Sequence, residues 1–388
     1  MCHDESTNLK MEQNFLRALA HVDRLASLAR QNGNGPGDGR GHAVRELLYR
    51  CHVFRPGIYP PQFPLSLKRG AHVAISILVA VKWGVDRLFL PLENHDWTLY
   101  LDIHVVSAIR LRRFPNLLKP KGFNDQMKWL MLFDQDEIMP LCVDKVAVRD
   151  LVSAAIGKEF LIPLRVASES WQEVGPRLHE GPGVLKCSHD SGSAALFDKL
   201  TAAEIEKLET KFRALGRREY GVGKGEWMYK GVRPQFLIEE RLSGRIAGAG
   251  PADIKVHCVD GQPKLIHVIE GRQTVQEQAF FSPEGTSLHL RVKPHRKTIA
   301  DLDITPILQL VLGPASKLAA PFKYVRVDMY VVENRCFFGE LSFHEQSGLF
   351  KNKFEERDLA AALGIKCSNP RKTIHNKIGS RGIALVER

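Results

Sequence analysis

The sequence predicts an α+β fold with antiparallel strands, preceded by a mainly helical N-terminal region. Apolar residues recur at helical spacing through roughly the first 115 residues. The rest of the chain has strand-like runs with two long helices among them, and these elements do not follow a regular βαβ order. With 388 residues, 44% hydrophobic and 26% charged, the chain fits a soluble protein of two or three domains.

The N-terminal region shows helical spacing in four segments, 14–30, 43–50, 70–90 and 96–113. The glycine-rich run 32–41 follows a helix rather than a strand and contains a proline. It therefore predicts a flexible linker and not a dinucleotide-binding fingerprint. The apolar stretch 73–92 contains three charges and is too short to span a bilayer. It predicts a buried helix, with a membrane-surface helix as the alternative.

Charge and cysteine usage narrow the class of protein. The net charge is +11, and residues 366–388 carry six Lys or Arg and one acid. This tail is either a solvated segment or a site for anionic surfaces or nucleic acid. The seven cysteines occur singly without a CxxC pair, which argues against a zinc ribbon or disulfide framework and fits a reducing cytoplasm. The polar, acidic first residues do not resemble a secretory signal.

Beyond residue 115 the predicted elements are helices and strands in mixed order. The helices are expected at 124–132, 144–156, 202–215 and 304–318. The strands are expected at 161–166, 183–187, 236–240, 254–259, 264–270, 324–331 and 336–343.

Two carboxylates stand on the last two predicted strands. Asp328 and Glu340 flank the polar turn 333–335, so we expect a hairpin with one acid on each strand and both on the same face. Paired carboxylates in an apolar setting repel each other unless a cation lies between them. Mg²⁺ takes oxygen ligands and usually binds through one or two carboxylates plus substrate phosphates. The pair therefore predicts a nucleotide site.

A polar loop follows the strand predicted at 183–187. The backbone N–H groups of such a loop, at Ser191, Gly192 and Ser193, can cradle phosphate oxygens, and Lys186 can add a charge. The loop differs from a Walker A motif because no Lys-Ser/Thr pair follows its last glycine. An ordinary turn is the alternative reading.

Other charged residues occupy positions that require a partner or a ligand. Glu239 or Glu240, at the end of a strand, could accept a hydrogen bond from a ribose hydroxyl. A helix over 144–156 would place Lys145 on one face with Arg149, one turn further along. Lys255 and Arg326 lie in mid-strand between apolar residues, so each needs a counter-charge. They belong either to internal ion pairs or to a phosphate and metal site.

Taken in order, these segments resemble the TupA-like branch of the ATP-grasp superfamily, which is associated with teichuronopeptide and other surface-polysaccharide biosynthesis. The likeness covers about residues 115–352. The matching stretches are 123–130, 144–149, 184–192, 238–240, 253–261, 325–330 and 338–343. The resemblance implies an ATP-grasp fold, in which two α+β lobes hold ATP between them.

The resemblance also implies roles for individual residues. Lys145 and Lys186 would hold the ATP phosphates, and the loop of Ser191, Gly192 and Ser193 would close over them. Glu239 or Glu240 would meet the adenosine. Asp328 and Glu340 would ligate Mg²⁺. Arg326 and Lys255 would be catalytic, stabilising the transferring phosphoryl group. At Ser342 the sequence departs from many ATP-grasp enzymes, which have an Asn that supplies a third metal ligand, whereas the TupA-like branch has a hydroxyl residue there. Asp190 stands where related proteins usually have Gly.

The predicted function is an ATP-dependent carboxylate–amine ligase that forms an amide through an acyl phosphate. ATP and Mg²⁺ would be its cofactors. Its partners would be a carboxylate substrate and an amine acceptor, with an anionic surface polysaccharide or its precursor as one class of substrate. Nucleic acid is not favoured. The location would be cytoplasmic, with peripheral association at the inner membrane face as an option. The alternatives are an ATP-grasp kinase acting on a hydroxyl and a non-catalytic nucleotide-binding scaffold.

The predicted organisation has four parts, which are a helical region, a small lobe with the phosphate loop, a C-terminal lobe with the magnesium site and a basic tail. Their expected limits are 1–115, 116–240, 241–365 and 366–388.

Overall fold

The computed structural model describes residues 75, 78–83, 86, 90, 92, 97–221, 223–242, 252–271, 275–299 and 302–367. The helices predicted at 14–30 and 43–50, the linker 32–41 and nearly all of the basic tail lie outside these residues. The helices are α4 (Trp97–Leu111), α5 (Phe123–Phe133), α6 (Met139–Val143), α7 (Val148–Ile156), α8 (Trp171–Val174), α9 (Ala202–Gly216), α10 (Thr305–Ala319) and α11 (Lys353–Leu363). Short 3₁₀ helices are η2 (Lys158–Phe160), η3 (Gly175–His179), η4 (Trp227–Tyr229) and η5 (Glu345–Gly348).

Within the described residues, ten strands form two separate sheets. They are β1 (Leu164–Ser168), β2 (Gly183–Cys187), β3 (Ala195–Phe197), β4 (Phe236–Glu240), β5 (Ala252–Val259), β6 (Gln262–Glu270), β7 (Glu277–Phe281), β8 (Lys297–Thr298), β9 (Tyr324–Val332) and β10 (Arg335–Ser342). The smaller sheet has the order β1-β4-β2-β3 and the larger has the order β10-β9-β5-β6-β7-β8. Among the strands just named, β7 and β8 pair in parallel and the other pairs are antiparallel. The predicted α+β class with antiparallel strands is confirmed.

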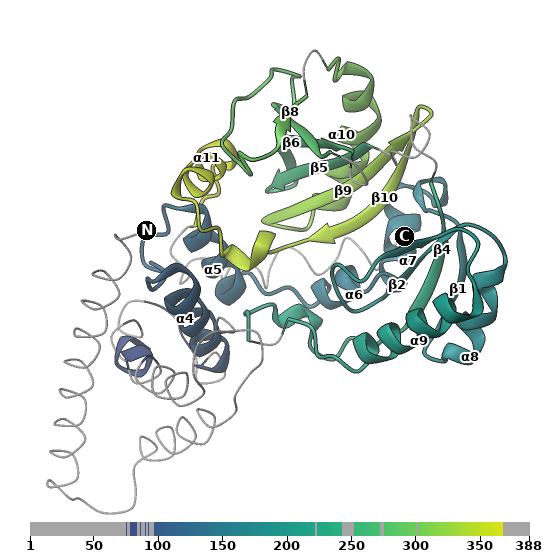
Figure 1. The fold of residues 1–388 in the computed structure, drawn as a ribbon. Coiled ribbons are helices and arrows are strands. Elements are labelled where there is room, and N and C mark those ends of the chain that lie inside the picture. The colour runs from purple at the N-terminus through teal and green to yellow at the C-terminus, as the bar shows by residue number, and fades with distance from the viewer. Residues whose placement is uncertain are drawn as a thin grey trace, which may run out of the picture.

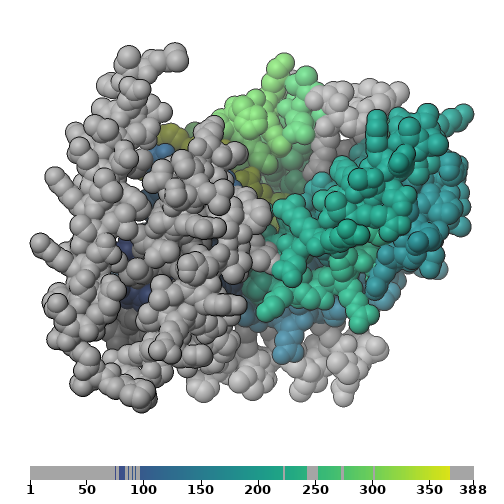
Figure 2. All heavy atoms as spheres, turned by 60° about the horizontal axis from the view of Figure 1, so that its bottom comes forward, coloured from purple at the N-terminus to yellow at the C-terminus, as the bar shows by residue number. Residues whose placement is uncertain are grey.

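Each sheet has its own apolar core. Trp171 of α8 and Phe212 of α9 are buried against the smaller sheet. On the larger sheet, alternate residues such as Val256 and Val327 face α10, where Val311 is fully buried. Period-two burial of this kind leaves the opposite face of the larger sheet to polar residues. Figure 1 shows the two sheets as separate bodies, and Figure 2 shows the smaller lobe, in teal, beside the green larger one.

Helices α4, α5 and α11 form a third apolar cluster at the end of the larger sheet (Figure 1). Trp129 and Tyr100 are among its fully buried side chains. Val79 and Leu90 belong to the same cluster, which favours the buried helix over the membrane-surface helix predicted for 73–92. Within the described part of the chain, no helix combines the length and apolarity that crossing a membrane requires.

The start of one predicted helix was wrong. Helix α7 begins at Val148 rather than at Asp144. The Asp144 carboxylate accepts a hydrogen bond from the backbone N–H of Val146 at 2.9 Å, which holds the chain in a turn. Lys145 therefore lies in this turn and does not share a helix face with Arg149. The sequence also did not predict β3, β7 and β8.

Candidate functional site

The two acids of the last hairpin lie directly opposite each other, as predicted. Glu340 of β10 pairs with Asp328 of β9, whereas Phe338 pairs with Met329. The extra residue in this register is Gly339, which forms a β-bulge. Because of the bulge, Phe338 points into the apolar core while Glu340, two residues on, points to the polar face with Asp328.

Asp328 is the centre of a buried ion cluster. Arg326 donates to both of its carboxylate oxygens, with Nε–Oδ1 and Nη2–Oδ2 distances of 2.5 and 2.7 Å. Lys255, its register partner on β5, also donates to Oδ2. Burial alone would raise the pKa of the Asp328 carboxyl, but the charges of Arg326 and Lys255 outweigh it and hold that pKa well below its usual range. Asp328 is therefore ionised at neutral pH.

Further acids lie around the Asp328 cluster. Asp253 lies 3.3 Å from Lys255, and Arg326 also contacts Glu345 and lies 3.5 Å from Glu340. The charged side chains that meet here are Asp253, Lys255, Arg326, Asp328, Glu340 and Glu345. Asp328, Glu340 and Glu345 share the charge of Arg326 and Lys255, and the positive charge of Lys145 also acts on Glu340.

The donor set suits a magnesium ion that shares its ligands with phosphate. The Glu340 side chain is 36% exposed, whereas that of Asp328 is only 5% exposed. The Ser342 hydroxyl accepts a hydrogen bond from Arg326 at 3.1 Å and lies 3.5 Å from Glu340 Oε1. No group of three or more His, Cys, Asp or Glu able to hold a metal occurs in the described ranges. Mg²⁺ does not need such a cage, because it usually binds through one or two carboxylates with phosphate oxygens and water.

The smaller sheet carries a second charged group. Lys186 of β2 donates to Glu239 of β4 at 2.6 Å, and Arg149 of α7 donates to the other Glu239 oxygen at 3.0 Å. Glu239 is buried between these cations, while Glu240, the next residue, is exposed on the other face of the strand. The two glutamates, which the sequence did not distinguish, therefore have different environments.

Lys145 connects the two sheets. Its ammonium group donates to the backbone carbonyl of Asp190 and lies 3.9 Å from the Asp190 carboxylate. Burial lowers the pKa of Lys145, whereas the negative charges of Glu340 and Asp190 oppose that shift. A small cavity lined by Lys145, Asp190 and Glu340 lies at this junction. Asp190 is thus the counter-charge of Lys145.

The residues of the predicted phosphate loop do not all face the same way. The Ser193 hydroxyl accepts a hydrogen bond from the backbone N–H of Cys187 at 2.9 Å, so Ser193 is buried and closes the loop upon itself. Ser191 and Gly192 are exposed. Gly192 has a φ of +90°, a value that side chains other than glycine rarely adopt.

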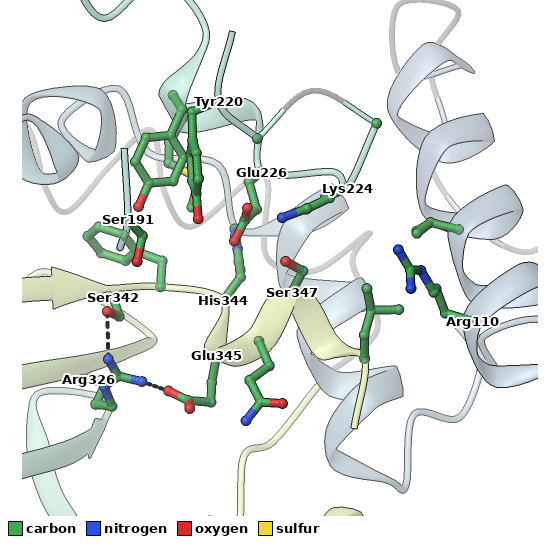
Figure 3. A pocket seen from close by; sticks show the side chains of 18 of the residues that line it. Arg110, Ser191, Tyr220, Lys224, Glu226, Arg326, Ser342, His344, Glu345 and Ser347 are labelled. Carbon is green, nitrogen blue, oxygen red and sulfur yellow. Dashed lines mark hydrogen bonds and ion pairs between the residues drawn. The ribbon is translucent and has the colours of Figure 1, made fainter. Parts of the chain in front are cut away.

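A cavity of about 990 Å³ opens beside the exposed acid, Glu340. Of the predicted site residues, it is lined by Ser191, Arg326 and Glu340. The others do not line it and lie in the cluster, at the junction or on the smaller sheet: Lys145, Lys186, Gly192, Ser193, Glu239, Glu240, Lys255 and Asp328. Figure 3 shows Arg326, Ser342 and Glu345 on one side of the cavity and Arg110 of α4 on the other.

The sequence reasoning missed the segment 218–229, which forms much of the cavity wall. Within it, Tyr220, Lys224 and Glu226 point toward the cavity between Ser191 and Arg110 (Figure 3). The signal was present in the sequence as glycines at alternate positions, 221, 223 and 225, around a lysine. Such spacing is typical of a backbone that approaches a neighbour or a ligand closely.

Comparisons with known proteins place the chain in a family. The family model described as TupA-like ATPgrasp matches residues 125–366, which is more than half of the chain. A D-alanine–D-alanine ligase from Bacillus anthracis is 16% identical with a TM-score of 0.35, and the match covers 61% of this chain and 67% of that one. The ATP-grasp ligase PsnB, complexed with a minimal precursor, is 15% identical with a TM-score of 0.28, covering 62% of each chain.

The macrocyclase MdnC from Microcystis aeruginosa is 13% identical with a TM-score of 0.27, covering 54% of this chain and 56% of that one. The chain thus spans less than two thirds of the PsnB and MdnC structures. A comparison with curated proteins gives no match. The family model covers both sheets and the ion cluster between residues 253 and 345. The protein therefore belongs to the TupA-like ATP-grasp family.

Proposed function

We propose that this protein is an ATP-dependent carboxylate–amine ligase. The γ-phosphoryl group of ATP is transferred to a substrate carboxylate, which gives an acyl phosphate and ADP. An amine then attacks the acyl carbon, the C–O bond to phosphate breaks, and an amide and inorganic phosphate form after the amine loses a proton. Family membership supports the ATP-grasp part of this proposal. The meeting of Lys145 and Glu340 at one junction supports the site, because it brings a phosphate-binding type of residue to the acidic hairpin.

The charge of each side chain indicates which part of Mg²⁺-ATP it would bind. Glu340 and Asp328 would hold Mg²⁺, which when bound neutralises charge on the phosphate oxygens. Lys145 and Lys186 would bind the ATP phosphates, which compete for the positive charge that Asp190 and Glu239 now neutralise. Glu239 or Glu240 would meet the adenosine, with Glu240 the one whose carboxylate is exposed.

The cavity side of the cluster would act on the acyl phosphate. Arg326 lines the cavity and is held by Asp328 and Glu345, so its guanidinium is fixed before substrate arrives. Lys255, which donates to the same Asp328 carboxylate, adds a second positive charge beside Arg326. Ser191 and Gly192, the exposed residues of the loop, would close over the phosphates and exclude water, which otherwise hydrolyses an acyl phosphate.

We further propose that the acid is a uronic acid or an amino acid of a surface polymer or its precursor, and that the amine belongs to a second component of that material. The net charge of +11 supports an anionic substrate. An enzyme acting on such precursors would work in the cytoplasm, in solution or at the inner face of the membrane.

A screen of ADP release with Mg²⁺ across candidate acids and amines tests the reaction, with mass spectrometry of the products. A ligase requires both substrates and releases free phosphate, whereas a kinase leaves phosphate on the acceptor. Glu340→Gln should reduce turnover by at least about 100-fold. Glu333→Gln, the same exchange at the exposed turn of the same hairpin, is the matched control and should retain full activity. Equal turnover in both variants would refute the role of Glu340.

A further inference from the structure

The contact between Lys145 and Asp190 closes the junction of the two sheets. The cavity that Lys145, Asp190 and Glu340 line there has a volume of only about 10 Å³. A space of this size holds at most one water molecule. A phosphate group is larger than a water molecule, so a nucleotide phosphate enters this cavity only after one of its walls has moved.

The wall that carries Asp190 is a loop fixed at its two ends. The Ser188 backbone N–H donates to the carbonyl of Gln235 at 2.9 Å, and the Ser188 hydroxyl accepts from the Gln235 N–H at 3.0 Å. At the other end, Ser193 accepts from the Cys187 N–H. Between these ends Gly192 is exposed, and no described atom beyond its chain neighbours lies within 4 Å of the position that a Cβ would take. The tip of the loop therefore has room to move while its ends stay in place.

The Asp190 carboxylate is held less firmly than the other acid beside a phosphate-binding lysine. Its Oδ1 atom lies 3.9 Å from the Lys145 ammonium group, which is beyond hydrogen-bond distance, and it accepts no hydrogen bond from any residue that the structure describes. By contrast, Glu239 accepts from Lys186 at 2.6 Å and from Arg149 at 3.0 Å. A phosphate oxygen therefore displaces Asp190 from its cation more readily than it displaces Glu239.

Other charges also act on Lys145. The negative charge of Glu340 favours the charged form of Lys145, and the positive charge of Lys186 opposes it. Among the described residues, however, Asp190 is the acid whose carboxylate lies within 4 Å of the Lys145 ammonium group. Asp190 is therefore the acid whose removal most directly frees the charge of Lys145 for a phosphate.

We propose that the Asp190 carboxylate is an internal competitor for nucleotide phosphate, an autoinhibitory contact that ATP displaces from Lys145. The inference rests on the proposed function for the assignment of Lys145 to the ATP phosphates. When ATP binds, the tip of the loop moves, Asp190 turns toward water, and Lys145 exchanges the carbonyl and carboxylate of Asp190 for phosphate oxygens. Because the closed contact is not competent to bind, it lowers the apparent affinity of the wild type for nucleotide.

Calorimetric titration of a non-hydrolysable ATP analogue into the full chain, with and without Mg²⁺, tests this contact. Asp190→Asn keeps the size of the side chain and removes its charge, so it should bind the analogue roughly fivefold more tightly than wild type. Asp198→Asn is the matched control and should bind as wild type does, because this exposed acid lies at the other end of the β2–β3 hairpin. The stoichiometry of each titration measures the fraction of folded protein.

A second pair of variants tests whether the competition acts through Lys145. In a Lys145→Met background, the gain from Asp190→Asn should fall below about twofold, because the two side chains compete as a pair. The inference is refuted if wild type binds the analogue and Asp190→Asn binds it no more tightly, or if the gain persists undiminished without Lys145.

Two further outcomes separate this inference from other roles of the loop and from the proposed function. If Asp190→Asn loses affinity only in the presence of Mg²⁺, Asp190 is a metal ligand and the autoinhibitory contact is refuted. If neither wild type nor Asp190→Asn binds the analogue, the ATP site of the proposed function is itself refuted. Binding in wild type without a gain in Asp190→Asn leaves the proposed function intact and removes only the inference.

Discussion

Asp328 is held by two buried cations, so removal of its charge leaves them partly uncompensated. We expect Asp328→Asn to lower the free energy of unfolding by roughly 3 kcal/mol. Urea unfolding measures this change. Glu333→Gln, at the exposed turn, is the control and should cost less than about 0.5 kcal/mol. A cost for Asp328→Asn below about 1 kcal/mol would contradict the central place of this carboxylate in the cluster.

Asp328 also makes the free energy of unfolding depend on pH in the acid range. Because the pKa of Asp328 is lower in the folded protein than in the unfolded chain, its contribution is present above pH 4. That contribution is lost as the pH falls below 4, where the unfolded chain binds a proton that the folded protein does not. Comparison of urea unfolding at pH 6 and pH 3 should show a smaller loss for Asp328→Asn than for wild type.

The buried Lys128 predicts that the free energy of unfolding depends on pH in the alkaline range. It is fully buried in α5, and within the described residues its ammonium has no hydrogen-bond partner. Burial lowers its pKa from about 10.5 to about 7, although Glu226 and Asp102 oppose the shift. Between these values the unfolded chain binds a proton that the folded protein lacks, so stability rises with pH.

Replacement of Lys128 by Met should therefore raise the free energy of unfolding at pH 7 by roughly 1–3 kcal/mol. The advantage should shrink by about 1 kcal/mol per pH unit up to pH 9.5, because the wild type gains stability there. Urea unfolding of both proteins from pH 7 to 9.5 measures it. A variant that is less stable at every pH by the same amount would show that Lys128 is stabilising as a cation.

At the scale of elements, the β-bulge at Gly339 orients the Glu340 side chain toward the polar face of the sheet. A Cβ atom at Gly339 would lie 3.0 Å from the backbone oxygen of Asp328 and 3.1 Å from the Tyr330 ring. Gly339→Ala should therefore cost about 1–2 kcal/mol of stability and weaken Mg²⁺-dependent binding of an ATP analogue. Gly364→Ala is a suitable control, because Gly364 ends α11 with a φ of +58° and alanine there costs about 1 kcal/mol far from the site. Equal analogue binding in both variants would contradict the bulge's role.

The hairpin could be predicted from sequence because its information is local. Apolar and polar residues alternate on both strands, and Glu333 and Asn334 have the positive φ values of a two-residue turn. The predicted start of α7 at Asp144 was wrong because apolar spacing does not reveal a side chain that caps a turn. The short strand β3 gave no pattern, since three residues are too few for a period.

At the scale of the whole molecule, the cavity could not be predicted. Its walls come from α4, the glycine-rich segment and the chain after β10, which are far apart in the sequence. Glycines at 221, 223 and 225 indicate close backbone contact, but not that the contact is with Ile103. Similarly, the partners of Lys186 and Arg149 follow from their tertiary arrangement around Glu239. The family resemblance indicated the order of the motifs along the chain, whereas the distances between their side chains follow only from the fold.

The central claim is that the acidic hairpin and the lysines of the smaller lobe form one site for ATP and Mg²⁺. Calorimetric titration of a non-hydrolysable ATP analogue, with and without Mg²⁺, tests it most directly in wild type, Lys186→Met, Glu340→Gln and Glu333→Gln. We predict that Mg²⁺ strengthens binding in wild type and in Glu333→Gln, and that Lys186→Met weakens it by about 10-fold or more under both conditions. Glu340→Gln should lose only the Mg²⁺-dependent gain. A full Mg²⁺-dependent gain in Glu340→Gln would contradict the account.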